Sequence, residues 1–277
     1  MKARARFPFQ RLLWAFVALL PLVLTTGCAT VGGGAPTRQS AGQKLDPWEN
    51  WNRKVFSFNE GLDEHLLKPV ATAYRKVTPS FLRTAISNFF NNAEDAWSAV
   101  NHFLQGKGES GMQMLVRFNT NTFFGLGGVL DIATEAGIER QPEDFGQTLG
   151  KWGFGAGAYI VWPVLGPSSV RDSLALPLDR TMTSPAPLFE PESVQWEMLG
   201  LQLVNTRAGL LDASRVIDDI ALDKYTFLRD GYLARRRSLV YDGNPPDTSP
   251  RDDAEDLAPA EKSEAAPPAG AASAPAQ

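Results

Sequence analysis

The side chains that could carry chemistry are few, and a glycine-rich loop is the first to examine. Gly153-Phe154-Gly155-Ala156-Gly157-Ala158 satisfies the G-x-G-x-x-A pattern of a dinucleotide-binding loop. Such a loop must lie between a strand and a helix, whereas the residues that follow, Tyr159-Ile160-Val161-Trp162-Pro163, are a poor helix sequence. We therefore expect no nucleotide cofactor.

Candidate nucleophiles and acid–base groups are also isolated. Ser168-Ser169 follows Gly166-Pro167, a pattern typical of a turn rather than of a nucleophile on a sharp strand-to-helix turn. Glu94 and Asp95 are adjacent acids, but neighbours in sequence do not face each other on a helix. Acids in a first helical turn, near the positive end of the dipole, explain them more simply. The sequence therefore predicts no enzyme.

Metal and nucleic-acid binding are disfavoured by composition. The chain has one cysteine and only two histidines, His65 and His102. We expect His65 to bind carbonyls at a helix end and His102 to be structural, so no metal is predicted. The net charge is −4, which gives no electrostatic case for a nucleic-acid partner.

The single cysteine follows a segment typical of a signal peptide. Residues 1–11 are basic, residues 12–24 are apolar, and Gly27 precedes Cys28. This resembles a bacterial lipoprotein signal, with Cys28 acylated after removal of residues 1–27, although Thr25 stands where leucine is usual. Ala29, rather than an aspartate, follows the cysteine, and this resembles the rule by which Gram-negative lipoproteins are sorted to the outer membrane. The alternative is an ordinary signal peptide with an incidental cysteine.

Composition divides the mature chain into three parts. Residues 28–45 are rich in small and polar residues and predict a flexible, lipid-anchored tether. Residues 242–277 contain eight acids, two bases, seven prolines and one large aliphatic residue, so they cannot offset their chain entropy and are expected to be disordered. The folded domain is therefore expected over residues 46–241.

The domain reads as mainly α-helical. Asp46 is expected to cap a helix over residues 48–66 that Pro69 ends. Apolar spacings of three or four predict further helices over residues 81–91, 97–104, 112–122, 196–210, 216–220 and 225–232, while residues 159–165 could be extended. No run of 18 apolar residues follows the signal, so no membrane-spanning helix is expected.

Many short motifs occur together in a fixed order over residues 46–241. They include Asp46-Pro47-Trp48-Glu49, Lys68-Pro69-Val70-Ala71, Ser87-Asn88-Phe89-Phe90-Asn91-Asn92, Gly125-Leu126-Gly127-Gly128, Glu143-Asp144-Phe145-Gly146-Gln147-Thr148-Leu149-Gly150 and Gly166-Pro167-Ser168. With the lipoprotein signal, they resemble the MlaA (VacJ) family of outer-membrane lipoproteins. The acidic tail lies outside the resemblance.

The resemblance implies a single helical, ring-like domain that lies in the inner leaflet of a Gram-negative outer membrane, on its periplasmic side. It implies removal of mislocalised phospholipid from the outer leaflet through an amphipathic channel, and delivery to a periplasmic lipid-carrier protein. The implied partners are phospholipid and a trimeric porin. A porin-binding scaffold without transport, or a periplasmic hydrolase of envelope substrates, remains as an alternative.

Aromatic and glycine-rich segments are the candidates for the wall of that lipid path. Aromatic side chains at helical spacing belong either to the core or to faces that lie in a lipid interface. The segment 123–130 is either a tight turn between core helices or a hinge of the path. The lipid-path candidates are Phe89, Phe90, Phe123, Phe124, Gly125, Leu126, Gly127, Gly128, Trp152 and Tyr159.

The basic run Arg235-Arg236-Arg237 is the candidate for headgroup contact. Each positive charge near an anionic surface contributes about 1 kcal/mol to membrane binding. The alternative is a solvated helix end.

The lipid anchor yields the first prediction. Because Cys28 is the only residue that can carry the acyl chains, Cys28→Ser should abolish processing at this position and reduce recovery in the outer-membrane fraction. Cell fractionation and mass spectrometry of the mature N-terminus measure both. Unchanged processing and unchanged membrane recovery would refute acylation.

Overall fold

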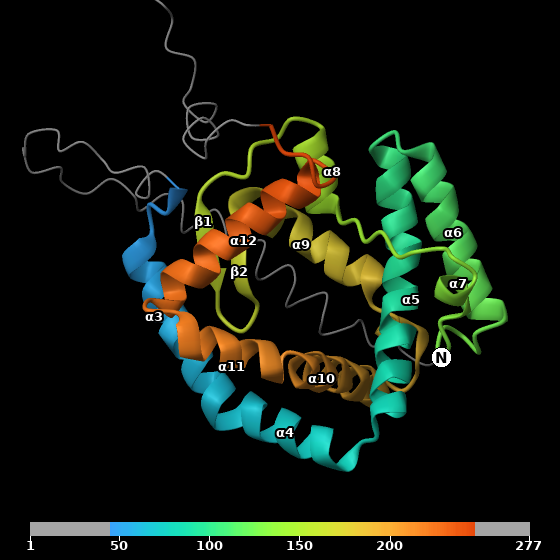
Figure 1. Ribbon diagram of the computed structural model, residues 1–277, viewed down its shortest axis with the longest axis horizontal. Coiled ribbons are helices and arrows are strands. Elements are labelled where there is room, and N and C mark those ends of the chain that lie inside the picture. The colour runs from blue at the N-terminus through green and yellow to red at the C-terminus, as the bar shows by residue number, and fades with distance from the viewer. Residues whose placement is uncertain (1–44, 247–277) are drawn as a thin grey trace, which may run out of the picture. The chain divides into compact units, whose positions relative to one another are not determined.

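The computed structural model describes residues 45–246 (Figure 1). The predicted signal peptide, Cys28, the tether up to residue 44 and the tail beyond residue 246 lie outside the described residues. Within the described part the protein is helical apart from one small hairpin of strands, which confirms the mainly α expectation.

The first helical rod is continuous from residue 49 to residue 77. It consists of α3 (Glu49–Leu62), the π-helical turn η1 (Asp63–Leu67) and α4 (Lys68–Val77). The prediction that Pro69 ends the first helix is wrong. Pro69 lies in the first turn of α4, and its missing N–H falls next to the wide π turn, where the helical hydrogen-bond pattern already changes.

Two antiparallel helices, α5 (Ser80–Leu104) and α6 (Gly108–Phe123), form a hairpin that Figure 1 shows at the right. The two helices predicted over residues 81–91 and 97–104 are one 25-residue helix. The polar stretch between them does not interrupt the backbone because its side chains find partners in neighbouring elements. Gly106, with φ +77°, turns the chain between α5 and α6.

The middle of the chain contains short elements. They are α7 (Ile132–Glu135), α8 (Phe145–Lys151), β1 (Tyr159–Trp162), β2 (Gly166–Ser169), α9 (Val170–Thr183) and η2 (Ala186–Leu188). The antiparallel strands pair Tyr159 with Ser169 and Trp162 with Gly166. The extended segment expected at 159–165 is thus a strand and its turn.

Two asparagines of α3 bind the free edge of β1. The Asn52 amide donates to the Tyr159 carbonyl at 3.1 Å and accepts from the Val161 N–H at 2.9 Å. Seven residues later, Asn59 donates to the Trp162 carbonyl at 3.0 Å and accepts from the Val164 N–H at 2.8 Å. Side-chain amides therefore replace a third strand, and no edge of β1 is left unpaired.

The C-terminal elements are α10 (Glu192–Gly209), α11 (Leu211–Ile220) and α12 (Lys224–Val240). Ala71 of α4 and Ala208 of α10 are fully buried against each other with Leu211, so the two helices approach closely. At the same contact Arg207 forms a two-pronged ion pair with Asp63, at 2.6 and 2.7 Å.

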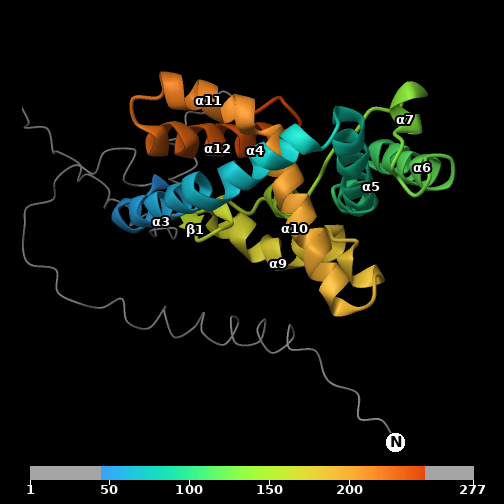
Figure 2. The ribbon, with the colours of Figure 1, turned by 90° about the horizontal axis from the view of Figure 1, so that it is seen from below.

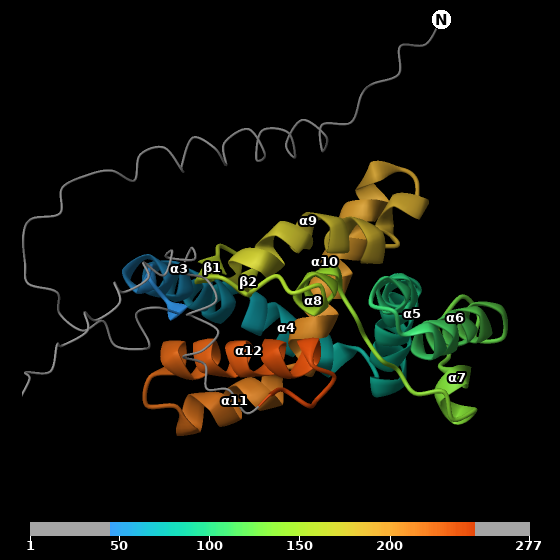
Figure 3. The same ribbon diagram turned by 90° about the horizontal axis from the view of Figure 1, so that it is seen from above.

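Contacts between elements close a circuit. From α4 it passes to α10, α5, α9, β2 and β1, and returns through α3 (Figure 1). Figures 2 and 3 show α11 and α12 on one side of the rod formed by α3 and α4, and the tip between α9 and α10 on the other. The ring-like arrangement expected from the sequence is present in residues 45–246, and none of their helices is long and apolar enough to cross a bilayer.

Asp46 does not cap α3. The residue before α3 is Trp48, and the Asp46 carboxylate instead accepts hydrogen bonds from the Asn52 amide at 2.8 Å and from the Tyr225 hydroxyl. Arg229 of α12 approaches it at 3.4 Å. Asp46 is buried, so these donors supply the partners that water would otherwise provide.

Asn52 yields a stability prediction. Asn52→Ala removes both amide contacts to β1 and the contact to Asp46, and leaves the buried groups of Tyr159 and Val161 unpaired. The free energy of unfolding should fall by about 2–4 kcal/mol. Urea denaturation followed by circular dichroism measures it. Asn119→Ala, at an exposed position within α6, is the control and should change stability by less than about 0.5 kcal/mol; equal effects would refute the role of Asn52.

Candidate functional site

A cavity with a volume of about 440 Å³ lies between α5, α9, α10 and the segment before α8. Phe90 and Leu176 are its only apolar lining residues. The polar lining residues are Ser87, Asn91, Glu94, Glu143, Asp144, Asp179, Arg180, Thr183, Gln202, Asn205 and Thr206. We call this space the polar cavity.

Three of the four acids in the wall of the polar cavity are paired with a cation behind them. Glu94 binds Arg140 at 2.6 Å, Glu143 binds Lys107 at 2.9 Å, and Asp144 binds Arg236 at 2.5 and 2.9 Å. Burial alone would raise the pKa of Asp144, but the Arg236 guanidinium and the Gln147 N–H outweigh it and lower this pKa. The negative charges of these three acids are therefore compensated, and they produce only a small electric field inside the cavity.

The fourth acid, Asp179, is held differently. Its Oδ1 accepts hydrogen bonds from the Trp97 indole at 2.7 Å and from the Phe145 N–H at 2.8 Å. Burial raises the pKa of Asp179, and these two hydrogen bonds offset only part of the rise. Its neighbour Arg180 is exposed, and neither residue forms an ion pair within residues 45–246.

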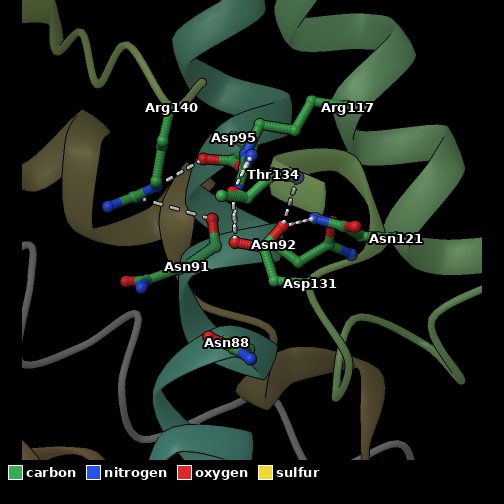
Figure 4. Close-up of a pocket in the computed structure, with 9 residues that line it drawn as sticks. All are labelled: Asn88, Asn91, Asn92, Asp95, Arg117, Asn121, Asp131, Thr134 and Arg140. Carbon is green, nitrogen blue, oxygen red and sulfur yellow. Dashed lines mark hydrogen bonds and ion pairs between the residues drawn. The ribbon is translucent and has the colours of Figure 1, made fainter. Parts of the chain in front are cut away.

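A second, smaller cavity of about 110 Å³ lies against the neighbouring face of α5 (Figure 4). Asn91 lines both cavities. The remaining lining residues are Asn88, Asn92, Asp95, Arg117, Asn121, Asp131, Thr134 and Arg140. One long helix thus separates two polar spaces and contributes to both walls.

Asp95 is the buried centre of the charge network in this second cavity. Its two oxygens bind Arg140 Nε at 2.6 Å and Arg117 Nε at 2.9 Å, and its side chain is 1% exposed. Asp95 and Glu94 lie in the middle of α5, so the expectation that they occupy a first helical turn is wrong. They are retained inside a helix because arginines from α6 and from the segment before α8 neutralise them.

Asp131 joins the same network from the loop before α7. It binds Arg117 Nη2 at 2.6 Å, Asn121 Nδ2 at 3.0 Å and the hydroxyl and N–H of Thr134 at 2.7 and 3.2 Å. Burial alone would raise its pKa, but these donors outweigh it and lower the pKa of Asp131 to about 2. The loop is therefore held by an ionised carboxylate.

The glycine-rich segment forms a hydrogen-bonded turn at the end of α6. Gly127 and Gly128 have φ +74° and +91°, and the Gly128 N–H donates to the Asn121 carbonyl at 2.8 Å. A Cβ on Gly125 would lie 2.2 Å from the Leu130 carbonyl oxygen, so no side chain fits there without a shift of the backbone. This geometry favours the tight-turn interpretation; the hinge remains a hypothesis.

The aromatic candidates do not gather at one place. Phe90 lines the polar cavity, while Phe89 packs edge-on against Phe90 and Phe189. Tyr159 is fully buried beside Tyr225 and Tyr232, and Trp152 donates its indole N–H to the Leu104 carbonyl at 3.0 Å. Phe123, Phe124 and Leu126 are 75%, 75% and 73% exposed and line neither cavity.

The basic run at the end of α12 splits into three environments. Arg235 is exposed, whereas Arg236 is half-buried and binds Asp144 and Asp172. Arg237 donates to the Pro246 carbonyl at 2.8 Å. Arg235 is therefore the exposed member of the run, and headgroup contact by these residues stays a prediction.

The polar lining of the cavity was missed from sequence, although α5 carries a signal for it. Ser87, Asn91 and Glu94 recur at spacings of four and three, as do Asn88, Asn92 and Asp95 beside them. Two such polar stripes, on a helix that also carries many apolar side chains, indicate two polar spaces. His65 and His102 bind the carbonyls of Gly61 and Gln141, as structural histidines do, and no cluster of metal ligands occurs within residues 45–246.

Fold and site together define a class: a helical protein with a polar, charge-balanced cavity inside a ring of elements and large apolar side chains on its outer surface. The sequence model of the MlaA lipoprotein family matches residues 44–239, so the chain belongs to that family.

Relatives extend this match over most of the chain. An Escherichia coli K12 protein named "Intermembrane phospholipid transport system lipoprotein MlaA" is 34% identical over 249 residues, covering 86% of this chain and 95% of the relative. A Haemophilus influenzae protein of the same name is 30% identical over 232 residues, covering 82% and 90%. A structure reported as "Structural basis for maintenance of bacterial outer membrane lipid asymmetry" aligns with a TM-score of 0.59 and 34% identity, covering 70% of this chain and 98% of that one.

Asp131 yields a prediction about pH. Its folded pKa, about 2, is below the unfolded value of about 4, so its contribution to stability is present above pH 4 and is lost as pH falls towards 2. The loss should be about 1 kcal/mol, since solvent screens part of the interaction. Asp131→Asn should be less stable at pH 7 and should lose less stability between pH 4 and pH 2.

Urea denaturation at pH 7, 4 and 2.5 measures the effect, with the difference between variant and wild type isolating one carboxylate from the others. Glu135→Gln, an exposed change on the neighbouring α7, is the matched control and should follow the wild type. Parallel pH curves for Asp131→Asn and the wild type would contradict the prediction.

Proposed function

We propose that this chain is an outer-membrane lipoprotein that takes mislocalised phospholipid from the outer leaflet and passes it to a periplasmic carrier protein. Acyl chains on Cys28 anchor it on the periplasmic side, and its action maintains lipid asymmetry. The name of the Escherichia coli relative, a phospholipid transport lipoprotein, and the aligned structure, reported for outer-membrane lipid asymmetry, support this proposal.

The observation that carries the proposal is the polar cavity of about 440 Å³ within the ring. A phospholipid that crosses between leaflets must move its charged headgroup past hydrocarbon, where an unpaired charge costs several kcal/mol or more. A cavity lined by amides, hydroxyls and charged groups replaces the headgroup's water. Phe90 and Leu176 in the same wall give the first carbons of the acyl chains an apolar contact.

The exposed apolar side chains on the outer surface of the domain are consistent with a position in the inner leaflet. Phe123, Phe124 and Leu126 project from the end of α6, and Leu188 and Trp196 are exposed at the tip between α9 and α10. A monotopic protein buries such side chains among lipid headgroups and acyl chains without spanning the bilayer. The proposed lipid path then runs inside the ring, with hydrocarbon outside it.

Partners follow from the same proposal. A trimeric porin would surround or support the body in the membrane, and a periplasmic carrier would receive the lipid. Transport needs no bond to be made or broken, so the mechanism consists of headgroup desolvation, partial replacement of water by the cavity wall, and release. A scaffold that only binds a porin and transports no lipid would not require a polar cavity.

Narrowing the cavity tests the proposal. Gln202 lines the cavity and makes no hydrogen bond with another described side chain, so Gln202→Trp adds bulk to the cavity at little cost to the fold. Outer-leaflet phospholipid in a deletion strain that expresses this variant should rise several-fold above the level with wild-type protein. Phospholipid that copurifies with the variant should fall in parallel.

Leu201→Trp is the matched control, because Leu201 is exposed on the same helix and does not line the cavity. All values are normalised to folded protein. If Gln202→Trp retains wild-type lipid content and activity, the polar cavity is not the path. If wild-type protein binds the porin but contains no phospholipid, the scaffold interpretation is correct.

A further inference from the structure

Two lining residues of the polar cavity, of opposite charge, have no ion-pair partner in the described part of the chain. Asp179 and Arg180 are consecutive residues of α9, and both line the cavity. Neither forms an ion pair within residues 45–246, although Glu94, Glu143 and Asp144 in the same wall each have a basic partner. The wall of this one cavity therefore offers a carboxylate and a guanidinium without ion-pair partners, and Arg236 acts on the Asp179 carboxylate only at longer range.

The carboxylate of Asp179 is fixed in place. Trp97 Nε1 and the Phe145 N–H both donate to Oδ1, at 2.7 and 2.8 Å, from α5 and from the start of α8. Two donors from separate elements on one oxygen orient the group and leave Oδ2 without a hydrogen-bond partner in the described part of the chain. A partly buried carboxylate with an unused oxygen is a site for a hydrogen-bonding cation.

Arg180 supplies the opposite charge without a fixed contact. Its side chain is exposed, and a guanidinium recognises phosphate oxygens through two parallel hydrogen bonds. Amides and hydroxyls of Asn91, Gln202 and Thr206 complete the lining of the cavity. Phosphate and cation could thus be held at the same time, but only in a ligand that carries both close together.

We propose that the polar cavity selects zwitterionic, amine-bearing phospholipid headgroups, with the ammonium on Asp179 and the phosphate on Arg180. This inference rests on the proposed function and adds the headgroup class to it. A glycerol headgroup has a phosphate for Arg180 but no cation for Asp179, so the carboxylate stays uncompensated. Because three of the four acids in the wall are paired with bases, the selection rests on Asp179 and Arg180 alone.

Competition between two lipids tests the selection. Delipidated full-length protein is equilibrated with vesicles of equal phosphatidylethanolamine and phosphatidylglycerol content, recovered, and its bound lipid measured by mass spectrometry. Wild-type protein should be enriched about fivefold in phosphatidylethanolamine, as expected for one charge-assisted hydrogen bond at a partly solvated site.

Two variants separate the roles of the charges. Asp179→Asn keeps an acceptor for Trp97 and Phe145 and removes only the charge, so the ratio of the two lipids should fall to about one with total lipid retained. Arg180→Gln should lower the total of both lipids. Asp219→Asn, at an exposed position on α11 that forms no ion pair in residues 45–246, is the control and should keep the wild-type ratio.

The outcomes distinguish this inference from the proposed function. Bound phospholipid with equal content of the two lipids in the wild type, or an unchanged ratio in Asp179→Asn, overturns the headgroup selection and leaves transport intact. A wild-type protein that binds no phospholipid overturns both. Displacement of bound lipid by soluble phosphoethanolamine would assign the cavity to a water-soluble ligand and overturn the lipid assignment.

Discussion

A carboxylate buried in the middle of a long helix sets the requirements for one half of the domain. Asp95 is 1% exposed, and its burial raises the pKa of its carboxyl; Arg117 and Arg140, which bind its two oxygens, offset part of this rise. Removing one partner of a buried ion pair costs about 3–5 kcal/mol, since the other charge is left without compensation. The position of α6, the loop before α7 and the segment that carries Arg140 all follow from this contact, because each delivers or supports one of these arginines.

The same principle shapes the polar cavity on the neighbouring face of α5. Three of its four acids are neutralised by bases that lie behind the wall, on α12 and in the segments beside α6 and α8, whereas Asp179 has no ion-pair partner in residues 45–246. Such an arrangement keeps the surface hydrophilic while the long-range field stays small. A headgroup inside would then meet hydrogen-bond partners without being held too tightly to leave, which is the condition for passage rather than storage.

Sequence reasoning predicted the elements better than their limits. Apolar residues at spacings of three and four located the helices, because burial of one face leaves that pattern in any sequence. It failed at Pro69 and between the two parts of α5, where the outcome depends on a π turn and on arginines that are distant in the chain. No local pattern contains the information that Arg236 would neutralise Asp144, 92 residues earlier. The aromatic residues were predicted to line the lipid path, yet Phe90 is the one aromatic candidate that lines the polar cavity; polar and charged residues of α5, α9, α10 and the segment before α8 form most of its wall.

The contacts of Asp46 determine where tension on the N-terminal part of the chain would enter the domain. It is the first buried side chain of the described residues, and it is joined to Asn52 of α3 and to Tyr225 and Arg229 of α12. A chain held at Cys28 would transmit tension through residue 46, and the load would pass into the two helices that meet there. The α5–α6 hairpin, on another part of the circuit, would be shielded from it. With the anchor that we propose at Cys28, the contacts of Asp46 would keep the force of anchoring away from the walls of the polar cavity.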